Sequence, residues 1–177
     1  MSEVQQIGIV GSGLMGTGIA EVSALAGLPV VLVKATGGDP DAVRARIQAA
    51  MAARVAKGKL AAADAEAALA RITVALDLDA VAGCDLVIEA IVEDLAAKRA
   101  LFARLAALLA PTAIIASNTS TLKIADLAAE LRPTRTLGLH FFSPVPAMSL
   151  VEIAHLPDTD ADDVMTHARA HESVDAS

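Results

Sequence analysis

Two stretches of this sequence carry polar side chains suited to moving a proton. The first stretch, Ser117-Asn118-Thr119-Ser120, comes just after the apolar run 113–115. The second stretch, residues 138–146, contains His140 and is followed by Glu152. A histidine can take a proton from an alcohol, because this side chain ordinarily titrates near neutral pH. A carboxylate on the other ring nitrogen fixes the tautomer and stabilises the imidazolium. A serine such as Ser120 could donate a hydrogen bond to the substrate oxygen.

The pairing of His140 with Glu152 requires the chain to reverse direction between them. Pro144-Val145-Pro146 lies in that interval and predicts a turn. Such a pair would act as the base while hydride leaves a secondary alcohol for a nicotinamide. The residue types alone leave a second interpretation open, in which His140 is a structural histidine beside an apolar strand.

A glycine-rich stretch near the N-terminus predicts a dinucleotide site. Gly11-Ser12-Gly13-Leu14-Met15-Gly16 follows an apolar run and precedes an Ala-rich helical pattern, which is the context that a G-x-G-x-x-G motif needs. Gly11 permits the tight turn, Gly13 lets a pyrophosphate approach the backbone, and Gly16 lets the helix pack closely on the strand. The anion would rest on the N-terminus of the helix. An ordinary tight turn is the alternative.

Lys34 ends the second apolar run, where dinucleotide-binding folds usually carry an acidic residue that holds the ribose hydroxyls. A lysine cannot accept those hydrogen bonds, but it can pair with a 2′-phosphate. The loop 35–39 adds a hydroxyl and backbone amides. The sequence therefore leaves both NAD and NADP open as the cofactor, because Asp39 or the main chain could hold the ribose instead.

Strand-like and helical patterns alternate along the chain, which is typical of a parallel sheet with helices on both faces. Strands are expected at 5–10, 30–34, 72–75, 85–90, 113–117 and 135–141, with a last, antiparallel strand at 149–154. Helices are expected at 14–26, 40–57, 61–70, 94–109 and, at the end of the chain, 160–172. We therefore predict one Rossmann-type dinucleotide-binding domain over residues 1–177, an α/β fold with a doubly wound, mostly parallel sheet.

Composition narrows the functional class. The 177 residues are 55% hydrophobic but only 2% aromatic, so the core must consist of Ala, Val, Leu and Ile. A net charge of −7 argues against a nucleic-acid partner, since phosphate backbones need a basic face. The single cysteine, Cys84, favours a reducing cytoplasm. We expect no signal peptide, no membrane span and no metal ion.

Four motifs taken together resemble the 3-hydroxyacyl-CoA dehydrogenase family. They are 11–16, 89–95 with Lys98, 117–120, and 138–146 with Glu152, in the family's order between about residues 6 and 153. The resemblance implies oxidation of the 3-hydroxyl of an acyl thioester, such as 3-hydroxybutyryl-CoA, with a nicotinamide cofactor. It implies that His140 and Glu152 transfer the proton and that Ser120 holds the substrate hydroxyl. The implied cofactor contacts are Gly11, Ser12, Gly13, Leu14, Met15, Gly16, Glu93, Lys98, Ser120 and Ser143, with Lys34 at the ribose.

The sequence departs from the family pattern at two of these positions. Lys34 replaces the family's ribose-binding Asp, and Ser143 stands where the family usually has Asn. The family's CoA contacts lie on the helix after the second strand. Arg54, Lys57 and Lys59 are the nearest candidates, and a solvated basic helix end is the alternative for them.

Members of the family continue into a helical domain that covers the acyl site and forms the dimer. We expect that domain to be absent from residues 1–177, so that this chain binds cofactor, turns over slowly and exposes apolar surface that favours homo-oligomers. Two further functions stay open. One is a dehydrogenase for a hydroxyacyl group on an acyl carrier protein of secondary metabolism, and the other is a non-catalytic nucleotide-binding module or fragment.

Overall fold

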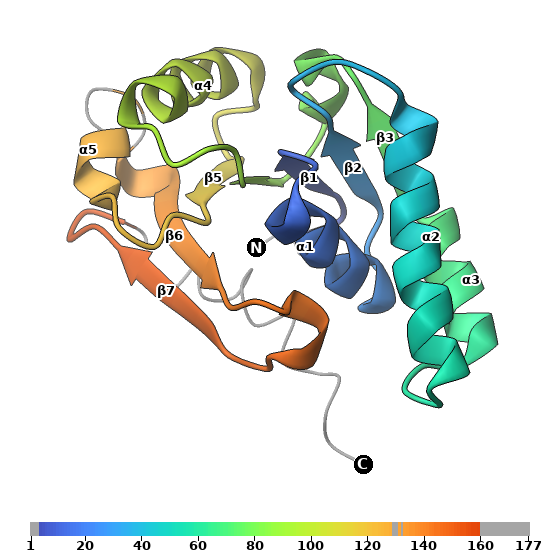
Figure 1. Cartoon of the computed structure of the whole chain (residues 1–177). Coiled ribbons are helices and arrows are strands. Elements are labelled where there is room, and N and C mark those ends of the chain that lie inside the picture. The colour runs from blue at the N-terminus through green and yellow to red at the C-terminus, as the bar shows by residue number, and fades with distance from the viewer. Residues whose placement is uncertain (1–3, 129–130, 132, 160–177) are drawn as a thin grey trace.

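The computed structural model describes residues 4–128, 131 and 133–159, and these form a seven-stranded sheet (Figure 1). Six strands are parallel in the order β3-β2-β1-β4-β5-β6, and β7 pairs antiparallel with β6 at one edge. The strand bounds are β1 Ile7–Val10, β2 Val30–Val33, β3 Ile72–Ala75, β4 Leu86–Glu89, β5 Ile114–Ser117, β6 Thr136–Phe141 and β7 Val151–His155. The order reverses between β1 and β4, which confirms the predicted Rossmann-type sheet.

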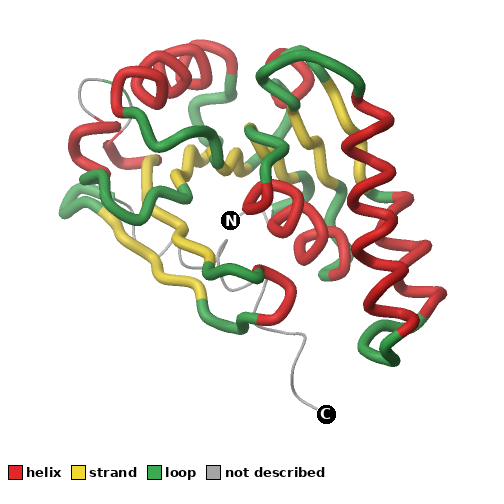
Figure 2. Tube along the Cα trace, viewed as in Figure 1, coloured by secondary structure: helices red, strands yellow, loops and turns green. Residues whose placement is uncertain are grey.

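Helices pack on both faces of this sheet (Figures 1 and 2). They are α1 Leu14–Leu25, α2 Pro40–Ala56, α3 Ala62–Ala70, α4 Leu95–Leu108 and α5 Ile124–Ala128. In β2, β4 and β5, alternate residues belong to different cores: Val30 and Leu32, for example, pack with α1 to α3, while Val31 and Val33 pack with α4 and α5. Burial on both faces explains why the strands read as unbroken apolar runs. Within the described residues, no helix has the length and apolar character needed to cross a membrane.

The predicted elements lie close to the observed ones. Asp39 and Asp94 cap α2 and α4 by accepting hydrogen bonds from the backbone N–H groups of Asp41 and Ala97. The sequence missed α5 and the short 3₁₀ helices at Leu78–Val81, Pro133–Arg135 and Val145–Ala147, because each is too short to show a helical period. The helix expected at 160–172 lies outside the described residues.

The turn from β1 to α1 brings backbone against backbone. Gly11 has φ +119°, a left-handed conformation that favours glycine, and a Cβ there would lie 2.4 Å from the carbonyl oxygen of Ala90. A Cβ on Gly16 would lie 1.7 Å from the carbonyl oxygen of Gly11. The first turn of α1 therefore sits directly on the end of β1, as the motif predicts.

Strands β6 and β7 form a hairpin whose connection reaches α1. His140 lies opposite Glu152 in the antiparallel register. The connection contains the predicted proline turn, and its residue Val145 packs on Gly18 of α1, where an added Cβ would come within 2.9 Å of the Val145 Cβ. A helical glycine thus fixes where the hairpin connection lies.

Substitution of Gly16 tests this close packing. We expect Gly16→Ala to lower the free energy of unfolding by at least about 2–3 kcal/mol, because the new methyl group collides with a backbone oxygen that cannot rotate away. Gly83→Ala is the matched control, since its Cβ would meet only the Gln6 side chain, at 3.9 Å. Urea unfolding of both variants checks the prediction, and equal midpoints would contradict it.

Candidate active site

A cleft of about 340 Å³ opens at the carboxyl edge of β4, β5 and β6. Parallel strands present their following loops at one edge, which is where open α/β sheets bind ligands. The cleft walls include Met15, Glu93, Lys98, Ser120, His140 and Ser143. Residues from the four motifs of the sequence therefore meet in one place.

His140 and Glu152 form a cross-strand pair. Their positions face each other in the β6–β7 register, and His140 Nδ1 lies 3.1 Å from Glu152 Oε2. The ring of Phe142 lies against the imidazole with centroids 4.5 Å apart. Because Nδ1 faces the carboxylate, Nε2 is the nitrogen that remains to face a ligand. The arrangement resembles the orienting half of a proton-transfer dyad.

Asn118 links the loop after β5 to the end of β6. Its side-chain Oδ1 accepts a hydrogen bond of 2.9 Å from the backbone N–H of Phe141, the residue after His140. Asn118 lines the cleft together with Ser120, which is exposed in the same loop. Sequence reasoning quoted Asn118 within a motif but gave it no role; its place between two predicted strand ends was the available signal.

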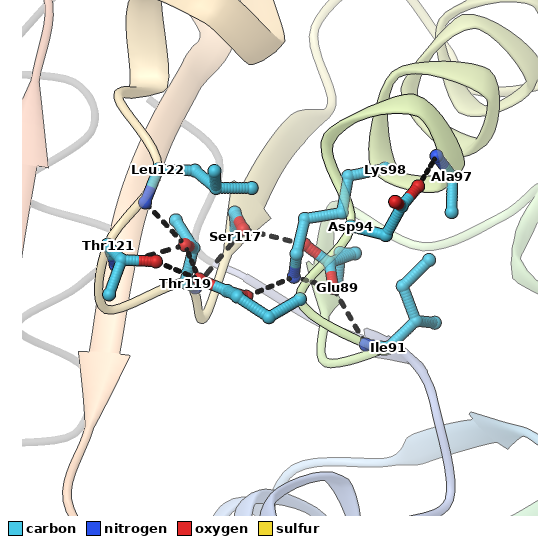
Figure 3. Close-up of polar contacts among 10 residues, drawn as sticks. Glu89, Ile91, Asp94, Ala97, Lys98, Ser117, Thr119, Thr121 and Leu122 are labelled. Carbon is cyan, nitrogen blue, oxygen red and sulfur yellow. Dashed lines mark hydrogen bonds and ion pairs between the residues drawn. The ribbon is translucent and has the colours of Figure 1, made fainter.

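The buried carboxylate of Glu89 contacts Lys98, one of the residues that line the cleft (Figure 3). Glu89, at the end of β4, is fully buried and accepts hydrogen bonds of 2.6 Å from Lys98 Nζ, 2.6 Å from Ser117 Oγ and 2.7 Å from the backbone N–H of Ile91. Buried charges require such partners, since an isolated one is costly. The sequence analysis included Glu89 in the motif 89–95 but gave it no role, although a glutamate that ends an apolar strand was a visible signal.

Glu93 forms a second ion pair with Lys98. Its Oε2 lies 3.2 Å from Lys98 Nζ, and its Oε1 accepts hydrogen bonds from the hydroxyls of Thr119 and Thr121. Burial works to raise the pKa of Glu93, but these hydrogen bonds and the lysine charge outweigh it and lower the pKa to about 2. Lys98 is therefore clamped between two carboxylates, with its ammonium fixed at the cleft wall.

The N-terminus of α1 leaves room for an anion. Gly13 caps the helix without a side-chain hydrogen bond, and a Cβ added there would meet no atom of the described residues within 4 Å, apart from its chain neighbours. Helix N–H groups therefore point into open space at the turn. Arg46 of α2 donates to the carbonyl oxygen of Ser12, which brings a guanidinium beside the turn. The sequence had not singled out Arg46. The turn fits a pyrophosphate group.

The remaining predicted cofactor contacts Leu14, Met15 and Lys34 do not all line the His140 cleft. Leu14 is 76% exposed at the start of α1, and Met15 lines the cleft beside His140. Lys34 lies at the end of β2 and does not line that cleft.

A second cleft, of about 880 Å³, runs between α1, α2 and the turn Val145–Ala147. Arg54, Lys57 and Lys59 line it, as does Arg46. Arg54 already forms an ion pair with the buried Glu21 of α1, so the two exposed lysines are the freer cations. The cleft reaches from the glycine turn to the hairpin connection, and its basic wall suits a ligand with phosphate groups.

The buried pair of Glu89 and Lys98 gives a stability prediction. We expect Lys98→Met to lower the free energy of unfolding by about 3–5 kcal/mol, because it leaves the Glu89 carboxylate buried without its cation. The double change Glu89→Gln/Lys98→Met should recover much of that loss, since no buried charge then remains. Urea unfolding measures both, with the exposed Arg99→Met of α4 as control. Equal losses from Lys98→Met and Arg99→Met would refute the interpretation.

Comparison with known proteins agrees with this arrangement. The sequence model described as 3-hydroxyacyl-CoA dehydrogenase, NAD binding domain, matches residues 6–176. The chain is 44% identical over 154 residues to 3-hydroxyadipyl-CoA dehydrogenase of Escherichia coli, covering 86% of this chain and 32% of that protein. It is 43% identical over 159 residues to 3-hydroxybutyryl-CoA dehydrogenase of Mycobacterium tuberculosis, covering 89% and 56%. The chain thus spans between a third and just over half of these relatives.

Solved structures give the same result. The crystal structure of 3-hydroxybutyryl-CoA dehydrogenase from Escherichia coli superposes with a TM-score of 0.91 and 40% identity, covering 97% of this chain and 37% of that one. That of (S)-3-hydroxybutyryl-CoA dehydrogenase from Ralstonia eutropha gives 0.87 and 36%, covering 95% and 60%. The predicted resemblance is confirmed, and the chain belongs to the 3-hydroxyacyl-CoA dehydrogenase family through that family's NAD binding domain.

Proposed function

We propose that this chain carries the cofactor site and the proton-transfer pair of an enzyme that interconverts 3-hydroxyacyl-CoA and 3-ketoacyl-CoA. The observation that carries the proposal is the contact of 3.1 Å between His140 and Glu152, in a cleft that also contains Ser120. The relatives named above act on CoA thioesters according to their names. A purely structural module would need neither a half-exposed histidine nor a carboxylate on its second nitrogen.

In the direction of oxidation, His140 Nε2 takes the proton of the 3-hydroxyl group. Glu152 holds Nδ1, so that Nε2 is presented unprotonated and the imidazolium that forms is stabilised. The Ser120 hydroxyl donates to the substrate oxygen and positions it. A nicotinamide dinucleotide, when bound, supplies the acceptor for the hydride from C3. In the reverse direction, His140 returns the proton to the ketone oxygen.

The residues of the glycine turn are proposed to hold the cofactor's pyrophosphate. Gly11 to Gly16 offer backbone N–H groups at the positive end of α1, and the missing side chain of Gly13 leaves space for the anion. Glu93, Lys98 and Ser143 line the His140 cleft, where the nicotinamide end would lie. The clamped Lys98 ammonium provides a fixed donor there rather than a mobile one.

The CoA portion is proposed to occupy the cleft of about 880 Å³. Lys57 and Lys59 are exposed at its wall and would pair with phosphate groups. Arg54 is tied to Glu21 and would support the helix rather than reach a ligand. The cleft ends at Val145–Ala147, close to His140 in the chain, so a thioester entering here would lead its acyl end towards the histidine.

Replacement of His140 tests the proton-transfer step. We expect His140→Asn to slow reduction of acetoacetyl-CoA by about 10²–10⁴-fold, because the general acid–base is lost while the glycine turn is unchanged. Single-turnover mixing with the protein in excess makes even a slow parent rate measurable. His155→Asn is the control, since among the described residues this exposed histidine of β7 has one hydrogen-bond contact, with the carbonyl oxygen of Leu156. Equal rates for the two variants would refute the role of His140.

Replacement of Gly13 tests the cofactor site without disturbing the fold. Gly13 has φ −71°, which alanine adopts readily, and the added methyl group meets no protein atom. We therefore expect Gly13→Ala to melt like the parent but to bind the dinucleotide at least about tenfold more weakly, or about 1.4 kcal/mol. Calorimetric titration measures the affinity, and an unchanged value would show that the pyrophosphate lies elsewhere.

A further inference from the structure

We propose that Lys34 and Thr36 form a binding site for the 2′-phosphate of the cofactor, so that this chain selects NADP(H) over NAD(H). The inference rests on the proposed function, because it concerns the adenosine end of the same dinucleotide. It adds a specificity-determining site that the family's NAD binding domain does not imply.

Lys34 stands at the ribose position of the fold. It directly follows Val33, the last residue of β2, and its backbone N–H donates to the carbonyl oxygen of Ala75 at 2.8 Å, which extends the β2–β3 ladder by one residue. β2 lies beside β1, the strand that leads into the glycine turn. In doubly wound folds the residue at this strand end faces the ribose 2′ position.

The lysine side chain is folded over its own loop. Its Nζ donates to Thr36 Oγ1 at 3.2 Å, and a Cβ on Gly38 would lie 3.4 Å from Nζ. Gly37 and Gly38 both have positive φ, 69° and 98°, which curls the loop back towards the strand end. An ammonium and a hydroxyl group therefore lie side by side, and Nζ keeps donors for an anion. Within the described residues, Lys34 forms no ion pair with a carboxylate.

Two acidic residues near the end of β2, Asp39 and Asp77, accept hydrogen bonds that cap helices. Asp39 Oδ1 accepts the hydrogen bond that caps α2, and Asp77 Oδ1 accepts from the backbone N–H of Asp79 to cap the 3₁₀ helix after β3. Neither stands at the end of β2, where a carboxylate would hold the ribose diol and repel a phosphate. The strand end thus favours the phosphorylated ribose by attraction and by the loss of that repulsion.

A cavity for the adenine base lies next to this loop. It has a volume of about 340 Å³ and opens at the carboxyl ends of β1 to β3. Val33 and Ala35, the two neighbours of Lys34, line it, together with Leu101 and Arg104 of α4 and with Asp77. Apolar walls suit a flat base, and a guanidinium can stack on one. A base in this cavity would bring its ribose to Lys34.

Parallel calorimetric titrations of the full 177-residue chain with NADPH and NADH test the proposal. Calorimetry is suited because the chain has no Trp or Tyr to report binding by protein fluorescence. We expect NADPH to bind about 10- to 100-fold more tightly, as one or two charge-assisted hydrogen bonds would give. We also expect 2′-AMP to displace NADPH at lower concentration than 5′-AMP. Higher salt should weaken NADPH binding more than NADH binding.

Variants of Lys34 test whether this residue sets the preference for NADPH over NADH. Lys34→Asp should reverse the preference in favour of NADH, and Lys34→Gln, which removes only the charge, should abolish it. Lys123→Asp is the control, because it makes the same charge change at an exposed site outside these cavities. A preference unchanged in Lys34→Asp, or tighter NADH binding by the parent, would overturn the proposal and leave the proposed function standing. Binding of neither dinucleotide would overturn both.

Discussion

The fully buried carboxylate of Glu89 is the constraint on which the rest of the site depends. It stands at the end of β4, a central strand, where desolvation makes an unpaired charge intolerable. Its three donors come from α4, from the end of β5 and from the loop after β4. Satisfying one charge therefore fixes the relative positions of three segments. Lys98, drawn in by Glu89, in turn fixes Glu93 and, through it, the loop with Thr119 and Ser120.

The register of β6 and β7 is a second constraint, and it positions the proposed proton-transfer pair. His140 and Glu152 meet because β6 and β7 are paired in a register that puts them opposite each other. A slip of one residue would turn one of the two side chains to the other face of the sheet. Two contacts hold the hairpin in place at the end where β6 and β7 are connected: Asn118 Oδ1 accepts from the backbone N–H of Phe141, and Val145 packs on Gly18. The His140–Glu152 pair is thus positioned by contacts with α1, which follows the glycine turn, and with the loop after β5, which also contains Ser120.

Much of this arrangement could be predicted from the sequence, since the signals were local. Apolar runs marked the parallel strands, and the glycine spacing marked the β1–α1 turn. The pairing of His140 with Glu152 could be expected because a proline turn separates them. The Glu89 network could not, because nothing in the sequence shows that Lys98 turns inward from α4 rather than towards solvent. The contact of Arg46 with Ser12 and the Glu21–Arg54 ion pair were missed for the same reason. They join α2 to the glycine turn and to α1, and the sequence does not show how these segments pack.

The distribution of charge explains how a chain of net charge −7 can bind anionic ligands. In the His140 cleft, where the nicotinamide is proposed to lie, Glu89 and Glu93 outnumber Lys98, the cation that they share, so the local charge disfavours a phosphate there. The groups proposed to recognise phosphate are the amides of the glycine turn, Lys57 and Lys59 just after α2, and Lys34 at the end of β2. These groups lie apart, so each can meet one phosphate locally, whereas the net charge acts only over longer distances that salt screens. In the proposed division of roles, Lys34 is the cation that neither the pyrophosphate nor the CoA cleft needs, and a third phosphate, on the ribose, would give it a function.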